Sequence, residues 1–515
     1  MKNNFLLNKE IPPIIRMPVK SLNDCYPIFN GEKIDYDFVL KLLNDKYIKN
    51  ALYIASPELY SALIERQENN EEVIISFLKY YIRMCTRSTP FGLFSSVSLI
   101  KNADLSNENN RLLSPKIRVA MEWIYDLNRK IIQEMSIFPH LSVVQNDAIH
   151  GFKTRTNFFG DSVYGKEHKK GSSLKKTILL DYILELTKDK FILIAEVFQK
   201  IQKNCDNSIN PKDIYSYVYE LVLKGVLVTN LEPCFNKQQS RIAHTISILS
   251  SIPAAYSYYS RLSNIELGLQ RINMDDIDFP QEKLMLIKEK MEKLVKSDRY
   301  FDSILVEDFN TISINSDKYN IGSELLDFLS SISLKLPINS TVSNYTERFL
   351  DKFGLSRELN LLHLLNSVHG LGFPTEYSNR NQNTPSNLFL NEMQTIFNNL
   401  LVKSIINNTY EIHINHSDII NLIERTANVN NDIDLSSELF FTELTDNKQI
   451  LPNSVLYLAP SYGSKQVGNT IGRFIDGFNK ENQELIKENN ELIVKSYEMN
   501  GIDLVTLISS TSKST

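Results

Sequence analysis

Apolar residues recur every three or four positions through much of the chain, and shorter stretches run together or alternate. The helical spacing is clearest at Ile74, Phe77, Leu78, Tyr81 and Ile82, and it predicts a helix over 74–86. Strands are predicted at 141–144, 151–159, 225–231, 304–309 and 502–508, and an extended segment from Ile11 has prolines that suit an edge strand. Further helices are predicted at 35–44, 57–68, 116–135, 177–187, 192–204, 211–224, 253–267, 278–297, 345–353 and 357–368, with Gly354 as the left-handed C-cap of 345–353 and a loop over 378–391. This mixture predicts an α+β fold in which helices pack on mixed sheets.

The length of 515 residues exceeds what one hydrophobic core usually supports, so several subdomains are expected. The pattern suggests parts at 1–140, 141–235, 236–478 and 479–515, the last ending in a polar tail. In the second part, three helices are followed by a glycine and a strand, which is the order of a winged helix. With 42% hydrophobic and 23% charged residues, the composition is that of a soluble globular protein.

The cysteines and the charge limit the possible classes. Cys25, Cys85, Cys205 and Cys234 stand singly, and we expect reduced thiols in the cytoplasm, with neither a disulfide frame nor a metal site. No apolar run is long enough to span a membrane. The net charge of −5, together with a third helix in 141–235 that is rich in tyrosine and poor in basic residues, disfavours a winged-helix reader of nucleic acid.

One corner of the chain carries two arginines four residues apart. Arg83 and Arg87 lie on one face near the end of the predicted 74–86 helix. Pro90 and Gly92 then end the helix, because proline forces the preceding residue into an extended conformation and glycine permits unusual backbone angles. An arbitrary arginine pair is usually solvated or salt-bridged. The surrounding sequence, however, makes this pair specific.

Five stretches together resemble the N-terminal, glutamylating region of the lantibiotic dehydratases of the nisin-dehydratase type. Arg-Ser-Thr-Pro-Phe-Gly-Leu-Phe at 87–94 follows Tyr-Tyr-Ile-Arg at 80–83. The other stretches are Ile-Arg at 15–16 with Leu-Asn-Asp at 22–24, Tyr-Thr-Glu-Arg-Phe-Leu-Asp-Lys-Phe-Gly at 345–354, His-Gly-Leu-Gly-Phe-Pro at 369–374, and Gly-Arg-Phe at 472–474. They occur in the family's order and span residues 11–478, so the set is far more specific than any one member.

The resemblance implies transfer of glutamate from glutamyl-tRNA to Ser and Thr hydroxyls of a ribosomal precursor peptide. Glutamyl-tRNA is then a co-substrate, and no bound cofactor is expected. The implied catalytic residues are Arg83, Arg87, Thr89, Arg473 and Glu307, and Arg16 and Asp308 are implied in binding tRNA or substrate. Fixed guanidinium groups suit the negative charge of a tetrahedral intermediate, so Arg83, Arg87 and Arg473 are expected to meet in one pocket. Neighbouring side chains on a strand point to opposite faces, and of Glu307 and Asp308 we favour Glu307 as facing the site.

In the resembling family, a module at 141–235 binds the leader of the precursor peptide through strand addition and a helix groove. This implies a leader-binding role for Tyr215 and Tyr219 on the third helix and for Val226 and Val228 in the strand. A tyrosine-rich, weakly charged helix suits a peptide better than DNA. A packing subdomain without a ligand is the simpler alternative.

Two departures from the family keep other interpretations open. Ala120 stands where the family has an aspartate, and Glu122 projects from a different face of its helix. Dehydratases of this type are also much longer, so a partner chain carrying the remaining glutamylation and elimination parts is expected. The main alternative is a catalytically inactive peptide-binding subunit or remnant of a dehydratase, and a winged-helix regulator of nucleic acid comes third.

Overall fold

The computed structural model describes most of the chain from residue 14 to residue 488. The described ranges are 14–31, 34–99, 112–146, 149–152, 155–158, 172–204, 210–232, 240–273, 281–308, 316–336, 340–355, 358–365, 370–372, 387–409, 411–412, 414, 416–428, 438–444, 455–457, 463–464, 470 and 472–488. They form two compact units. The larger unit contains residues 12–313 and 474–483, and the smaller contains residues 314–473 and 484–505. The boundaries at 140 and 235 lie inside the larger unit and stay predictions.

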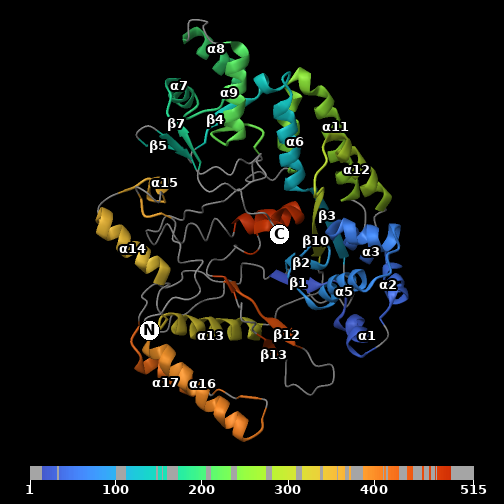
Figure 1. Ribbon diagram of the computed structural model, residues 1–515. Coiled ribbons are helices and arrows are strands. Elements are labelled where there is room, and N and C mark those ends of the chain that lie inside the picture. Colours follow the sequence, from blue (N-terminus) through green and yellow to red (C-terminus); the bar gives the residue numbers. More distant parts are fainter. Residues whose placement is uncertain are drawn as a thin grey trace. The chain divides into compact units, whose positions relative to one another are not determined.

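A four-stranded mixed sheet lies at the centre of the larger unit (Figure 1), in the order β1 (Ile14–Pro18), β2 (Ser95–Leu99), β10 (Phe301–Asp308) and β3 (Leu112–Val119). β2 is antiparallel to β1 and parallel to β10, and β10 is antiparallel to β3. Pro12 and Pro13 precede β1 and Pro18 ends it, and β1 is an edge strand of the sheet, as the prolines predict. In the sheet, β10 therefore lies between β2 and β3, although both precede it in the chain by about 180 residues or more.

Helices cover one face of this sheet, and a later segment lies on the other. The helices are α1 (Tyr26–Phe29), α2 (Tyr36–Leu43), α3 (Lys46–Ala55), α4 (Pro57–Tyr60) and α5 (Glu71–Thr86), with the short helical turns η1 (Leu22–Cys25) and η2 (Ser61–Glu65). α3 packs against β10 and α5 against β1, and Leu305 of β10 belongs to their buried core. On the opposite face, Gly477 lies so close to Val306 that a Cβ atom at Gly477 would be 2.7 Å from Val306 Cγ2.

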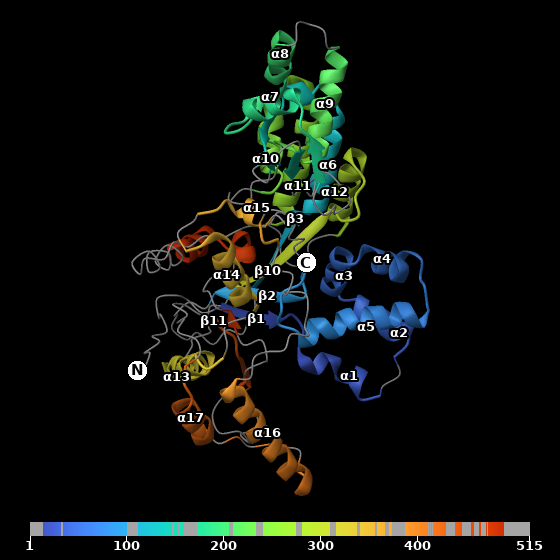
Figure 2. The ribbon, with the colours of Figure 1, turned by 60° about the vertical axis from the view of Figure 1, so that its left-hand side comes forward.

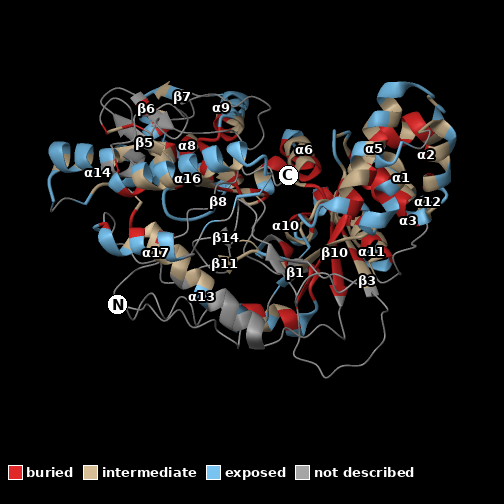
Figure 3. Ribbon diagram, turned by 90° about the horizontal axis from the view of Figure 1, so that it is seen from below, coloured by how far each residue is buried: buried red, intermediate tan, exposed pale blue. Residues whose placement is uncertain are grey.

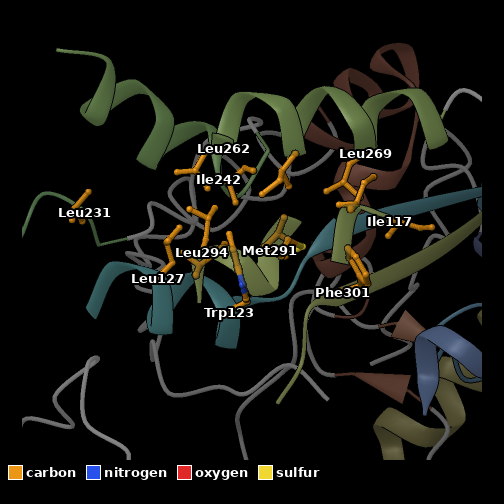
Figure 4. Close-up of a cluster of buried hydrophobic side chains, with 14 of the residues drawn as sticks. Ile117, Trp123, Leu127, Leu231, Ile242, Leu262, Leu269, Met291, Leu294 and Phe301 are labelled. Carbon is orange, nitrogen blue, oxygen red and sulfur yellow. The ribbon is translucent and has the colours of Figure 1, made fainter. Parts of the chain in front are cut away.

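A second part of the same core lies between α6 (Met121–Gln133) and three later helices, α10 (Ala243–Ser250), α11 (Tyr256–Ile272) and α12 (Gln281–Leu294). Figure 4 shows Trp123 beside Leu127, Leu294 and Met291 in this cluster. Trp123 is completely buried, and its indole Nε1 donates a hydrogen bond of 3.1 Å to the Val295 carbonyl. The apolar stripe of α6 thereby fixes the end of β3 against the helices that precede β10.

The segment predicted as a winged-helix-like module contains three helices and two small antiparallel sheets. The helices are α7 (Ile178–Leu186), α8 (Ile194–Asn204) and α9 (Pro211–Leu223). One sheet has the order β8 (Ile192–Leu193), β4 (Ser142–Gln145), β9 (Leu227–Thr229), and the other β5 (Ile149–Phe152), β6 (Arg155–Phe158), β7 (Ser172–Lys175). Figure 1 shows the three helices beside β4, β5 and β7, and Figure 2 shows the same three helices from another side. The order of elements is compatible with a winged helix, and that finer assignment stays a prediction.

The smaller unit contains the helices α13 (Ser316–Ser333), α14 (Ser340–Phe353), α15 (Leu361–Leu364), α16 (Leu388–Ile406) and α17 (His416–Arg425). Its strands form two short antiparallel pairs, β11 (Glu438–Leu439) with β14 (Gly463–Ser464), and β12 (Thr442–Leu444) with β13 (Val455–Tyr457). Gly354 ends α14 at a φ of +78°, and its N–H donates to the Leu350 carbonyl. This left-handed C-cap is the one that the sequence predicts.

The α+β class is confirmed, whereas several element boundaries were wrong. Residues 116–119 belong to β3 and not to the helix predicted over 116–135, because they pair with β10. Residues 151–159 were predicted as one strand, but the described part of that stretch contributes to two strands, β5 and β6, paired as a hairpin. Residues 192–193 are a strand before α8, and residues 388–391 of a predicted loop are the first turn of α16. The strand predicted over 502–508 lies outside the described residues.

Candidate functional site

The corner that follows α5 holds the candidate arginines in a backbone fixed by hydrogen bonds. Asn70 caps the start of α5, where its side chain accepts a hydrogen bond of 2.9 Å from the Val73 N–H. After Thr86 the backbone becomes extended at Arg87, and Gly92 has a φ of +56°. The Ser95 hydroxyl then donates to the Arg87 carbonyl at 2.6 Å and to the Thr89 carbonyl at 3.3 Å. One serine of β2 thus fixes the loop that carries Arg87 and Thr89.

Arg83 and Arg87 lie close enough to influence each other electrostatically. The Arg83 guanidinium stacks on the Phe91 ring, with its Cζ atom 4.6 Å from the ring centre, and its Nε is buried without a hydrogen-bond partner. Burial, and then the neighbouring charge of Arg87, lower the pKa of Arg83 from its ordinary value. In the part of the chain that the structure describes, neither guanidinium forms an ion pair with a carboxylate. The corner is therefore a cationic site that an anion would stabilise.

Arg87 and Thr89 are exposed, whereas Arg83 is half-buried. Arg83 can act as a fixed charge beneath the surface, since stacking on Phe91 limits its rotamers. The two sequence-predicted arginines and the predicted threonine are thus together on one corner.

Arg16 lies elsewhere on the same unit and is linked to the last part of the predicted site. The Arg16 Cζ atom is 5.7 Å from the centre of the Phe474 ring, which is buried in η6 (Gly472–Gly477). Arg473 is joined directly to Phe474, but its side chain lies outside the described residues. Convergence of Arg473 with Arg83 and Arg87 therefore stays a prediction.

Glu307 lies inside the sheet and not on its surface. Its side chain is completely buried, and it accepts a hydrogen bond from the Ser96 hydroxyl of the neighbouring strand. Val306 pairs with Val97, which in turn pairs with Arg16, so alternation along the strands places Glu307 on the face opposite to Arg16. The catalytic role of Glu307 and the binding role of Asp308, whose side chain lies outside the described residues, stay predictions.

Ala120 is the N-cap of α6 and has no side-chain cap. It is completely buried, and its N–H donates to the Tyr300 carbonyl at 2.9 Å. An aspartate at this position would place its carboxylate in the buried junction of β3 and α6. The position is therefore structural in this chain, and the carboxylate of the resembling family is absent from it.

Glu232 is a half-buried residue near α6 that the sequence did not single out. Its Oε2 is buried without a hydrogen-bond partner, and burial raises its pKa from 4.5 to about 7. Because the protonated form is favoured in the folded state, this group costs no stability below pH 4.5 and destabilises the fold progressively as the pH rises from 4.5 to 7. At pH 8, a shift of this size corresponds to about 3 kcal/mol.

Glu232→Gln is therefore expected to raise the free energy of unfolding at pH 8 by about 2 kcal/mol, with a much smaller change at pH 5. Chemical denaturation at the two pH values measures this difference. Glu185→Gln, at an exposed position of α7, is the matched control and should change stability little at either pH. An equal gain at pH 5 and pH 8 would contradict the pKa shift.

The predicted leader-binding residues are half-buried or buried in the α9 region. Tyr215 and Tyr219 stack on each other with ring centres 6.3 Å apart, and both contact the Phe138 ring edge-on. Val226 is buried, whereas Val228 is half-buried in β9. β9 lies at the edge of its described three-stranded sheet. The tyrosines thus support the packing of the module, and the strand offers an edge for pairing.

Two of the signature stretches hold each other in the smaller unit, which the sequence did not reveal. Tyr345, Arg348 and Lys352 lie on one side of α14, at spacings of three and four residues. Their side chains donate to three consecutive carbonyls, those of Gly372 at 2.7 Å, Leu371 at 3.1 Å and Gly370 at 2.7 Å. A Cβ atom on Gly370 would lie 2.1 Å from the carbonyl oxygens of His363 and Leu364. We call this arrangement the α14 clamp.

The remaining chemical predictions concern metals, thiols and membranes. Within the described residues, no group of three His, Cys, Asp or Glu side chains is arranged to hold a metal ion. Cys25 and Cys85 are free and buried, and burial raises the pKa of the Cys85 thiol to about 12; Cys205 and Cys234 lie outside the described residues. A membrane-spanning helix, long and apolar enough to cross a bilayer, is not found in the described part.

The sequence matches a known family along most of its length. Residues 44–507 match the family model described as the N terminus of lantibiotic dehydratases. This match includes the Arg83–Arg87 corner, the α14 clamp and the Arg473 segment. The chain belongs to this family, which confirms the resemblance drawn from its five stretches.

Three relatives show how much of the family's length this chain covers. It is 24% identical to the epidermin biosynthesis protein EpiB of Staphylococcus epidermidis, over 92% of this chain and 47% of EpiB. It is 27% identical to the subtilin biosynthesis protein SpaB of Bacillus subtilis, over 86% of this chain and 43% of SpaB. The tRNA-dependent lantibiotic dehydratase MibB of Microbispora sp. 107891 has a similar fold, with a TM-score of 0.70 at 19% identity, over 92% of this chain and 46% of MibB. The chain thus spans less than half the length of these relatives.

Proposed function

We propose that this chain is the part of a lantibiotic dehydratase that places glutamyl-tRNA against a precursor peptide and promotes transfer of the glutamyl group. The observation that carries the proposal is the corner with Arg83 and Arg87, two guanidinium groups that form no ion pair within the described part of the chain. The family match supports the acyl-transfer chemistry, and the tRNA dependence of MibB supports tRNA as the glutamyl carrier.

The proposed reaction is balanced and requires no nucleotide hydrolysis. The hydroxyl oxygen of a Ser or Thr attacks the carbonyl carbon of the glutamyl ester, and a tetrahedral oxyanion forms. The bond from that carbon to the tRNA ribose oxygen then breaks, and the ribose oxygen takes up the proton that the Ser or Thr hydroxyl has lost. The products are a glutamyl ester on the peptide and free tRNA.

The arginine corner would contribute charge at two places. Arg83, held by Phe91, is suited to a fixed anion such as a phosphate of the tRNA acceptor end, since its position requires no reorganisation. Arg87 and Thr89 are exposed and would meet the reacting carbonyl or the peptide hydroxyl. In this proposal, Arg473 and Arg16 also contribute positive charge, and Glu307 is a positioning residue that holds Ser96.

The proposal includes a second polypeptide, which supplies the rest of the glutamylation part and an elimination part. The experiment mixes this chain, that partner and the precursor peptide with tRNA charged with labelled glutamate. Label on the peptide, absent when free glutamate and ATP replace glutamyl-tRNA, is expected. Label transfer without this chain would overturn the proposal.

One observation favours a second candidate, a peptide-binding subunit without catalysis. Ala120 is buried at the position of the family aspartate and offers no carboxylate. In that case the chain would still bind the leader peptide. Glutamyl transfer by the partner would then not require an aspartate at position 120 of this chain. Transfer that depends on Arg87 would exclude this candidate.

Leader binding through the edge of β9 predicts an alternating dependence on the peptide backbone. The N–H of Asn146 donates to the Val226 carbonyl and that of Asn230 to the Ser142 carbonyl, so every second residue of β9 faces β4 and Leu227 faces the open edge. A bound leader strand would use every second N–H in the same way. N-methylation of one alternate set of leader residues is expected to weaken binding at least tenfold, and methylation of the other set to have little effect.

Titration of the two methylated peptides against this chain measures the difference. The pattern should persist at moderate salt, since few charges are neutralised in such binding. If both peptides bind equally well, the proposal of strand addition at β9 is wrong. A steep dependence of the affinity on salt would show that charge makes the main contribution to binding.

A further inference from the structure

A small hollow lined by positive side chains lies where α6, α11 and α12 meet in the larger unit. Its volume is about 130 Å³, and the residues that line it come from all three helices, namely Lys130, Ser257, Tyr258, Arg261, Lys293 and Leu294. We call these six residues the α6–α11–α12 pocket. α6 carries buried and half-buried residues over most of its length (Figure 3), and Leu294 belongs to the buried core. The pocket therefore rests on a packed scaffold.

Lys130 is held at the pocket by a hydrogen bond of its own. Its side chain is half-buried, and its Nζ donates at 2.5 Å to the carbonyl of Leu294, the last residue of α12. An ammonium group has three N–H donors, so the other two are available to a ligand. A side chain that is already fixed loses little conformational entropy when a ligand binds.

The other two cations of the pocket, Arg261 and Lys293, are exposed. Neither forms an ion pair within the described part of the chain. Burial, and then a hydrogen bond of 3.1 Å to the Glu134 carboxylate, raise the pKa of Tyr258 to about 12, while the charge of Arg261 acts in the opposite direction. Tyr258 is therefore neutral, and three positive side chains face the one carboxylate of Glu134, which does not line the pocket.

This set of donors fits a phosphate group. Three cations that face one hollow repel one another, so an anion that enters between them stabilises the folded chain. The Lys and Arg side chains and the Ser257 hydroxyl supply N–H and O–H donors from three helices, and the oxygens of a phosphate can accept from several directions at once.

The surface around the pocket favours a phosphate that belongs to a chain of phosphates. Lys290 and Lys296 stand three residues before and after Lys293, and both are exposed without an ion pair in the described residues. Tyr256, next to Ser257, is 68% exposed. A row of basic side chains with an aromatic ring beside it is typical of surfaces that bind RNA. The net charge of −5 does not oppose this, since only a local patch is required.

We propose that the α6–α11–α12 pocket binds a backbone phosphate of RNA, and that the lysine row of α12 continues the contact along the strand. This inference rests on the proposed function, which brings a tRNA to this chain. It adds a contact on helices other than the one that carries Arg83 and Arg87. Since the pocket contains none of the residues proposed for acyl transfer, it contributes to the affinity for tRNA and not to the chemical step.

Binding of tRNA at several salt concentrations tests the pocket. The double variant Arg261→Gln with Lys293→Gln removes two exposed charges, and it is expected to weaken tRNA binding about tenfold and to reduce the slope of log affinity against log salt by about 1. The double variant Arg271→Gln with Lys188→Gln is the matched control. It removes two charges at exposed positions outside the pocket, and Arg271 lies about 15 Å further along α11. The control should change neither quantity, and an unchanged affinity and slope in the pocket variant would overturn the proposal.

Inorganic phosphate distinguishes RNA from a free phosphate as the source of the group. A pocket that takes only the free ion would let inorganic phosphate raise the melting temperature of the wild type and not that of the pocket variant, while both chains bind tRNA equally well. That result would also overturn the proposal.

The assay with labelled glutamate separates this inference from the proposed function. The pocket variant should need about tenfold more glutamyl-tRNA to reach half of its maximal rate, and its rate at saturating glutamyl-tRNA should equal that of the wild type. A lower saturated rate would contradict a role in affinity alone. Binding of tRNA that depends on the pocket, without any glutamyl transfer, would refute the proposed function alone. Transfer with an unchanged requirement for glutamyl-tRNA would refute the pocket alone.

Discussion

Arg87→Ala is expected to lower glutamyl transfer to the precursor peptide by a factor of about 100 or more. Arg87 is exposed at the end of α5, where its carbonyl is fixed by the Ser95 hydroxyl, so the side chain is presented without a described carboxylate partner. Removing one fixed donor from an oxyanion or phosphate contact typically costs about 3 kcal/mol. The loss should appear in the rate of a single turnover and leave the binding of the leader peptide unchanged.

Three variants make this prediction specific. Arg66→Ala removes an exposed arginine that pairs with Glu68, and it should leave the rate unchanged. Arg87→Lys keeps the charge without the planar fork, so its rate should lie between those of the wild type and Arg87→Ala. Arg83→Ala should lower the rate as well, and the double variant should lose less than the product of the two single effects, since the groups act on one anion. Additive losses would place them at separate contacts.

Gly370→Ala is expected to destabilise the smaller unit by about 3 kcal/mol or more. The added methyl group would lie 2.1 Å from two backbone carbonyl oxygens, and backbone cannot yield as a flexible side chain can. Movement of residues 370–372 would also break the hydrogen bonds from Tyr345, Arg348 and Lys352. Hydrogen exchange along α14 and the melting temperature of the whole chain measure the effect.

Gly472→Ala is the control for this substitution. A Cβ atom at Gly472 meets no other atom within 4 Å, so stability should change by less than about 0.5 kcal/mol. If Gly370→Ala is equally harmless, the α14 clamp is not a rigid part of the unit. In that case the hydrogen bonds between the two signature stretches would not explain the residues that occur in them.

Local patterns in the sequence predicted the elements that depend on local forces. The helix that ends at Thr86, the edge strand that begins near Ile14 and the glycine cap at Gly354 follow from periodicity, proline and backbone freedom, and the structure confirms them. Residues 116–119 look helical in isolation and are a strand because β10, far along the chain, pairs with them. Single-sequence reasoning contains no information on such distant partners.

The candidate site shows the same limit. Arg83, Arg87 and Thr89 are near one another in the sequence and are close in the fold. The α14 clamp, by contrast, joins side chains to carbonyls about 20 residues away, and no local pattern in the sequence predicts these hydrogen bonds. The burial of Glu307 was also not predictable, since a glutamate in an apolar strand can face either water or a hydroxyl such as that of Ser96. The stacking of Arg83 on Phe91 likewise depends on the fold of the corner, which the local sequence does not specify.

The position of β10 between β2 and β3 determines the order in which the protein can be completed on the ribosome. β3 ends at Val119 and β10 begins at Phe301, so at about 5 to 20 residues per second roughly 10 to 40 s pass before the strand that joins the two is synthesised. During that interval, β2 and β3 have open edges in the nascent chain, which makes them targets for chaperones and sites of mispairing. The helices from α6 to α12 are synthesised in the meantime, and they can pack around Trp123. The resulting core can hold β2 and β3 far enough apart for β10 to insert between them. Synonymous codons that slow translation near residue 300 would therefore lower the yield of folded protein more than the same codons placed after residue 316.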